Sequence, residues 1–145
     1  MLLSGTMTPP ELKPPTYIVP TPSLAYLVVY VLIAVYGAGS SIVGVATVTD
    51  VSGQLWGTAY PALVIIAAGI ASSGILHTRR TGKAGRELVG TLAVVALFAG
   101  YIVQIIARTI DDGNPARLPV GVLVLALLVF PIKRGVNISR GVTIR

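Results

Sequence analysis

The stretch LVGTLAVVALFAGYIVQIIA, residues 88–107, decides the fold because it contains no charged residue. A helix of this length is about 30 Å long, which matches the hydrocarbon core of a bilayer. Glu87 precedes the stretch and Arg108 follows it, so charge is confined to its two ends. The stretch therefore predicts a transmembrane helix.

Three further apolar runs lie on either side of this stretch, at residues 23–49, 56–76 and 118–132. As a helix, the last run is only about 22 Å long, which is short for a span, and a re-entrant or tilted interfacial helix is its alternative. Pro131 predicts a kink or an exit near its end. With residues 88–107, the runs predict an all-α integral membrane protein with four transmembrane helices and short loops.

The composition agrees with a membrane protein. Charged residues make up 11% of the 145-residue chain, against roughly 25% in typical globular proteins. The chain has no cysteine, which excludes disulfide frameworks, Cys-ligated zinc and iron–sulfur clusters. The chain has a net charge of +6. In a membrane protein such an excess of basic residues is typical, because cytoplasmic loops that face anionic lipids are rich in Lys and Arg.

Two terminal segments flank the membrane domain at residues 23–132. Residues 1–22 contain six prolines, so they cannot form a continuous helix. They predict an extended cytoplasmic arm, either disordered or docked along the membrane surface. Residues 133–145 predict a short basic cytoplasmic tail.

The basic residues predict the orientation in the membrane. Four spans place both termini on one side, and that side carries all but Arg108 and Arg117 of the eleven basic residues. Short cytoplasmic loops are enriched in Lys and Arg, so both termini are expected in the cytoplasm of a bacterial inner membrane. The residues expected to contact anionic headgroups, and not nucleic acid, are Arg79, Arg80, Lys83 and Arg86 in the connector at 77–87 and Lys133 and Arg134 in the tail.

Small residues recur at four-residue spacing in the predicted spans. Such residues let helix backbones approach closely where lipid provides no hydrophobic drive. They predict packing within one chain or between copies, and the spacing does not separate these alternatives. The set is Gly37, Ser40, Ser41, Gly44, Gly69, Ser72, Ser73, Gly74 and Gly100.

Few polar side chains lie within the spans, and Tyr36, Tyr101 and Gln104 are the main ones. Gln104 needs a partner in hydrocarbon, and an interhelical hydrogen bond contributes about 0.6–2 kcal/mol. Helix packing is the first interpretation of these residues. The lining of a wet lumen is the second.

Catalytic and metal-binding patterns are weak. His77 has no carboxylate beside it in the sequence, which favours a residue at the membrane interface over a base or ligand. Asp111, Asp112 and Asn114 form a turn sequence first and a small cation site second. We expect no enzyme activity, no cofactor and no metal. The predicted spans hold no ionisable residue at depth, which also disfavours a small transporter of the multidrug type.

The chain resembles the small multi-span membrane proteins of actinobacteria and their phages, some of which are holins. The features that carry the resemblance are the short length, the Ala/Val/Gly-rich spans and the basic tail KRGVNISRGVTIR, residues 133–145. The resemblance implies a protein that self-associates in the cytoplasmic membrane and permeabilises it. The alternative is a non-conducting interaction, accessory or exclusion protein that binds a membrane partner, and a small transporter is third.

Overall fold

The computed structural model describes residues 16–18, 22–43 and 45–144. Within these residues the chain forms five α-helices, one short 3-10 helix and two short strands. Their order is β1 (Thr16–Ile18), α1 (Leu24–Val43), α2 (Ala46–Ser52), α3 (Gln54–Thr81), α4 (Gly85–Asp112), η1 (Pro115–Arg117), α5 (Leu118–Arg140) and β2 (Val142–Ile144).

Four of these helices, α1, α3, α4 and α5, are long and apolar enough to cross a membrane. Their outward faces carry large apolar side chains such as Leu32, Val103 and Leu123, each more than half exposed. A soluble protein of this size rarely exposes so continuous an apolar surface, whereas acyl chains are a suitable environment for it. The prediction of four helices long and apolar enough to span a membrane is confirmed.

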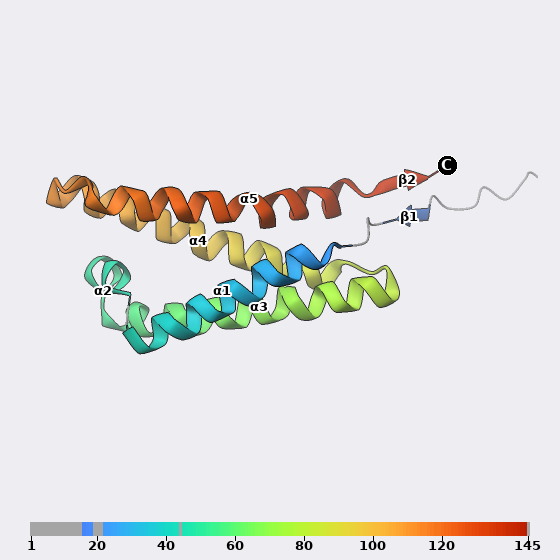
Figure 1. Ribbon diagram of the computed structural model, residues 1–145, viewed down its shortest axis with the longest axis horizontal. Helices are drawn as coiled ribbons and strands as arrows, with labels where there is room; N and C mark the ends of the chain where they lie inside the picture. The colour runs from blue at the N-terminus through green and yellow to red at the C-terminus, as the bar shows by residue number, and fades with distance from the viewer. Residues whose placement is uncertain (1–15, 19–21, 44, 145) are drawn as a thin grey trace, which may run out of the picture.

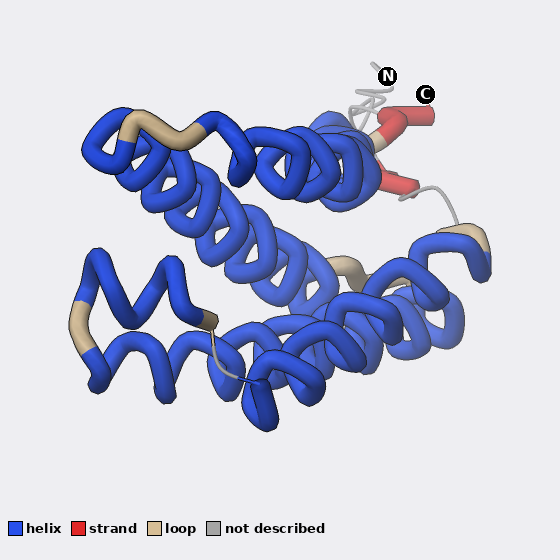
Figure 2. Tube along the Cα trace, turned by 60° about the vertical axis from the view of Figure 1, so that its left-hand side comes forward, coloured by secondary structure: helices blue, strands red, loops and turns tan. Residues whose placement is uncertain are grey.

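The long helices pack side by side in the order α1, α3, α4 and α5. Helix α1 packs on α3, α3 packs on α4, and α4 packs on α5. Helix α1 makes much less contact with α5, so the four helices form an open array instead of a closed ring (Figures 1 and 2). The short helix α2 folds back against α3 and α4. This order leaves α1 and α5 apart over part of their length.

The connector between α3 and α4 is shorter than expected. Helix α3 continues to Thr81 and α4 begins at Gly85, so residues 77–81 and 85–87 are helical. Gly82 ends α3 in the left-handed conformation with φ of 71°, and its N–H donates to the carbonyl of Thr78 at 2.8 Å. Glycine adopts this conformation without steric cost, which allows the tight reversal.

The fourth helix is longer than the predicted run at 118–132. Helix α5 has 23 residues and ends at Arg140, so it is about 34 Å long and a full-length span is available. Pro131 lies inside the helix and does not end it, which corrects the predicted exit. A proline removes one backbone hydrogen bond, and membrane helices tolerate this where neighbouring groups compensate. The predicted tail therefore begins as helix.

The first two predicted spans also have different boundaries. The run at 23–49 is divided, because α1 ends at Val43 and α2 begins at Ala46. Helix α3 begins at Gln54, so Pro61 lies inside it and not in its first turn. Gly53, with φ of 85°, makes the sharp turn from α2 into α3.

The two described chain ends meet at one end of the bundle. Strand β1 pairs antiparallel with β2, with Thr16 opposite Ile144 and Ile18 opposite Val142 (Figure 1). The all-α prediction missed this short pairing, and residues 1–15 of the predicted arm lie outside the described residues. Both ends of the four-helix region therefore lie at the same end of the bundle, as an even number of membrane-spanning helices requires.

Candidate functional site

Some of the small residues lie where two helices approach most closely. A Cβ on Gly37 would lie 3.1 Å from the carbonyl oxygen of Pro61, and a Cβ on Gly74 would lie 2.5 Å from the backbone nitrogen of Glu87. A Cβ on Gly90 would overlap the backbone of Ala71. These glycines therefore set the α1–α3 and α3–α4 distances. Gly90 was not among the predicted packing residues because no small residue accompanies it at four-residue spacing.

Other predicted packing residues face outward. Beyond the backbone of their own helical turns, no described atom lies within 4 Å of a Cβ built on Gly69 or Gly100. Ser73 is exposed and donates to the carbonyl of Ile70 on its own helix at 3.0 Å. Of the rest, Ser40 is buried, Ser41 is exposed and donates to the carbonyl of Gly37, Ser72 is partly buried, and Gly44 lies outside the described residues.

A buried ion pair joins α4 to α5. The Glu87 carboxylate accepts from Arg134 Nε at 2.6 Å and from Arg134 Nη2 at 3.1 Å. The exposed fraction is 0% for the Glu87 side chain and 2% for that of Arg134. Two parallel charge-assisted bonds make this the strong, directional form of the pair.

Helix α1 contributes two tyrosines to the same region. The Tyr26 ring lies 5.7 Å from the Arg134 guanidinium carbon, within the range of a cation–π contact. One turn further along α1, the Tyr30 hydroxyl and Thr91 Oγ1 form a buried hydrogen bond of 2.8 Å. The ion pair and these two contacts connect α1, α4 and α5. We call Tyr26, Tyr30, Glu87, Thr91 and Arg134 the ion-pair cluster.

The ion-pair cluster corrects one expectation. Arg134 was predicted to contact lipid headgroups, but it is buried against Glu87 and Tyr26. Glu87 and Arg134 lie just outside the predicted spans at 88–107 and 118–132, so the expectation that those spans hold no ionisable residue at depth is not contradicted. Each residue stands at the end of an apolar run, and the partners are 47 positions apart in sequence, so the pattern gave no sign of their pairing. The other predicted headgroup residues, Arg79, Arg80, Lys83, Arg86 and Lys133, are exposed.

The opposite end of the bundle carries a looser set of charges. Arg108 lies 3.4 Å from Asp50 of α2 and 3.5 Å from Asp112 one turn away on α4. About a third of each of these side chains is exposed. Asn114 caps η1 by accepting from the N–H of Ala116 at 3.0 Å. Asp111 and Asp112 are the last two residues of α4, and only Gly113 and Asn114 form the turn to η1.

The predicted intramembrane polar residues lie close to this end. Gln104 Nε2 donates to Ser52 Oγ at 3.0 Å, which gives Gln104 a partner on α2. The Tyr101 ring lies 5.7 Å from that of Tyr60 on α3, and the Tyr36 ring lies 5.8 Å from that of Phe98. Helices α1, α3 and α4 thus bring their aromatic side chains into one region of the interior.

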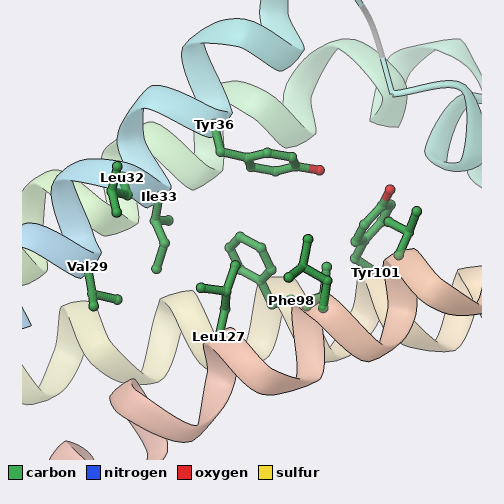
Figure 3. A pocket seen from close by; sticks show the side chains of 10 residues that line it. Val29, Leu32, Ile33, Tyr36, Phe98, Tyr101 and Leu127 are labelled. Atoms are coloured by element: carbon green, nitrogen blue, oxygen red, sulfur yellow. The ribbon is translucent and has the colours of Figure 1, made fainter.

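An apolar groove opens between α1, α4 and α5, where α1 and α5 diverge. Its volume is about 180 Å³ and its walls include Val29, Tyr36, Phe98 and Leu127. Figure 3 shows the Tyr36 and Tyr101 hydroxyls at one end of the groove and the Phe98 ring with aliphatic side chains along the remainder. Because almost all of its lining is apolar, the groove does not form a polar passage through one copy of the chain.

The described residues include no group of three or more His, Cys, Asp or Glu side chains that could hold a metal ion. His77 is partly buried near the end of α3. The chain matches no protein-family model, no curated protein and no solved structure at a significant level.

Proposed function

We propose that this chain is a holin-like protein of a bacterial cytoplasmic membrane, which self-associates there and permeabilises it. The observation that carries the proposal is the outward position of Gly69 and Ser73 on α3. Beyond its own helical turn, no described atom lies within 4 Å of a Cβ built on Gly69, and the Ser73 hydroxyl bonds to its own helix, so the two small residues face away from the other described helices. Small-x3-small surfaces of this kind let two membrane helices pack backbone to backbone.

The interior of one copy supports assembly as the route to permeability. The core is filled by apolar side chains such as Ile33, Val64, Ala68 and Val94, and its ionic side chains are paired. A water-filled path therefore requires surfaces that several copies provide together. The orientation belongs to the same proposal: both termini and the basic α3–α4 connector face the cytoplasm, where Arg79, Arg80, Lys83 and Arg86 meet anionic headgroups.

Inducible expression tests the proposal. The expected result is an abrupt loss of membrane potential, followed by lysis when an endolysin is co-expressed. Gly69→Leu places a bulky side chain between these small residues and the proposed partner helix, and it is expected to delay or abolish both effects and to reduce cross-linked oligomers. Val103→Leu is the matched control, because Val103 already exposes a large side chain. Abundant protein with normal growth and an unchanged potential contradicts the proposal.

A non-conducting interaction protein is the second candidate, and the groove between α1, α4 and α5 favours it. An apolar groove that opens sideways from the bundle suits a transmembrane helix of a partner. This candidate predicts stable membrane protein without loss of potential, so the same expression experiment separates the two. A small transporter ranks third, because Glu87, the carboxylate buried in the bundle, is engaged by Arg134.

A further inference from the structure

A second groove lies between the beginning of α4 and the end of α5, at the end of the bundle where β1 and β2 meet. Its volume is about 330 Å³, and its walls include Leu92, Val95, Pro131, Ile132 and Val136. Leu92, Ile132 and Val136 are each more than a third exposed, so the groove opens outward. In a membrane, an outward groove on two spanning helices faces the lipid.

The wall of this groove is continuous with the rigid interior of the bundle. Thr91 lines the groove and also forms the buried hydrogen bond with Tyr30 at 2.8 Å. A Cβ built on Gly135 would lie 3.7 Å from Thr91 Cγ2, which is an ordinary contact distance. The absence of a side chain at Gly135 therefore keeps the space between α4 and α5 open.

The groove passes from the uncharged part of α5 to its charged end. Val95 and Ile132 line the part that belongs to the uncharged runs, whereas Ser139 lines the part in the last turn of α5. Seven residues of helix separate Ile132 from Ser139, a rise of about 10 Å. The groove therefore offers hydrocarbon contact along one part and a polar border at the other, as an amphiphile requires.

Two cations border the polar part of the groove. Lys133, Val136 and Arg140 lie at positions i, i+3 and i+7, so they share one face of α5, and Val136 is a wall of the groove. Lys133 and Arg140 are both exposed. Among the described residues Glu87 is the only acidic one at this end of the bundle, and Arg134 already pairs with it. The border of the groove therefore carries positive charge that no exposed carboxylate offsets there.

We propose that this groove binds a phospholipid with an anionic headgroup, such as phosphatidylglycerol. One acyl chain lies along Leu92 and Ile132, and the headgroup phosphate lies between Lys133 and Arg140. A zwitterionic phospholipid has the same chains, but its own cation offsets its phosphate and weakens the attraction. The inference rests on the membrane insertion that the proposed function assumes. It does not rest on self-association, because every residue in the site belongs to one copy.

A tryptophan beside the groove measures which lipid occupies it. Trp56 is the chain's only tryptophan, so Trp56→Phe with Val129→Trp places a single reporter on the exposed face of α5, three residues before Ile132. The full chain is reconstituted in vesicles of phosphatidylglycerol and phosphatidylcholine, with one or the other brominated on its acyl chains. We expect the quenching to show about tenfold preference for phosphatidylglycerol, which falls as salt is added.

A second reporter separates the groove from charge alone. Leu76→Trp, again with Trp56→Phe, lies on the exposed surface of α3 three and four residues before Arg79 and Arg80, and Leu76 lines neither groove. Exposed charges without a groove contribute little. We therefore expect a clearly smaller preference for phosphatidylglycerol at this position.

Variants then assign the preference to the two parts of the site. Lys133→Gln/Arg140→Gln should bring the two lipids to nearly equal affinity at the Val129→Trp reporter, and both side chains are exposed, so folding is expected to be retained. Gly135→Leu keeps both cations but fills the groove, and it should also reduce the preference. Gly100→Leu, toward the other end of α4, is the matched control and should leave the preference unchanged.

Three outcomes contradict the proposal. Equal affinity of the two lipids at low salt removes the role of the cations. The same preference at the Leu76→Trp and Val129→Trp reporters means that charge attracts the lipid without a site in the groove. Absence of quenching by either lipid at Val129→Trp means that a helix of a second copy or of another protein covers the groove. Membrane potential is not part of this measurement, so the lipid site and the proposed permeabilisation can fail separately.

Discussion

The two ends of the helical bundle differ in how their polar side chains are paired and exposed. At the end where β1 and β2 meet, which we call the closed end, Glu87 is paired with Arg134 and Tyr30 with Thr91, all within the bundle. At the other end, the open end, Arg108 and its partners are about one-third exposed, and two buried polar atoms of Tyr60 and Gln104 make no hydrogen bond with described residues.

This difference shows that the two ends of a bundle with few charges can have different structural roles. A buried ion pair is costly to form, and it becomes favourable only when both partners are fully engaged, as they are at the closed end. Such an arrangement fixes the positions of three helices. At the open end the polar groups are partly exposed or buried without a described partner, so they hold the helices together less firmly.

The largest expected effect comes from breaking the ion pair. Arg134→Leu leaves the Glu87 carboxylate buried without its partner and should lower the free energy of unfolding by about 3–5 kcal/mol. Thermal unfolding in detergent measures this loss. The double variant Glu87→Leu/Arg134→Leu should recover most of the stability, since no charge is left buried. A loss below about 1 kcal/mol in the single variant means that water reaches the pair.

The second-largest loss of stability is expected where α3 and α4 lie closest together. Gly90→Leu forces α3 and α4 apart at Ala71 and should cost about 1–3 kcal/mol or more, as overpacking does. Gly100→Leu, on the same helix with open space around it, should cost much less. Their unfolding temperatures provide the comparison. Equal losses in the two variants would show that Gly90 does not set the helix distance.

A smaller effect is expected from Tyr30→Phe. It leaves the Thr91 hydroxyl buried without its partner on α1 and should cost about 1–2 kcal/mol. The double variant Tyr30→Phe/Thr91→Val removes both polar groups and should be closer to the parent. If the double variant instead loses the sum of the two single effects, the hydrogen bond is not the source of the stability.

The smallest effect is expected at the open end. Asp50→Asn removes one carboxylate beside Arg108, but these side chains are partly exposed and Asp112 also lies near the cation. The loss should stay below about 1 kcal/mol and shrink further with added salt. Unfolding measured at low and high ionic strength checks both points. A loss as large as that of Arg134→Leu would remove the distinction between the two ends.

The number of membrane-length helices could be predicted from the sequence, because uncharged runs of about 20 residues have few alternative structures. Their ends could not, since charged residues such as Arg79 and Arg134 also continue helices, and Pro131 is accommodated within α5. The ion-pair cluster was missed because its partners meet only in three dimensions. Small-residue spacing marked Gly37 and Gly74, but spacing alone could not show that Gly69 faces outward.

The proposed membrane orientation, with both chain ends in the cytoplasm, is tested most directly by cysteine labelling. The chain has no cysteine, so Thr81→Cys near the closed end and Ala116→Cys near the open end each introduce a single exposed thiol. A membrane-impermeant maleimide is applied to intact cells and to lysed cells. We predict that Ala116→Cys is labelled in intact cells and Thr81→Cys only after lysis, whereas the reverse pattern, or equal labelling of both in intact cells, would contradict a four-span protein with cytoplasmic ends.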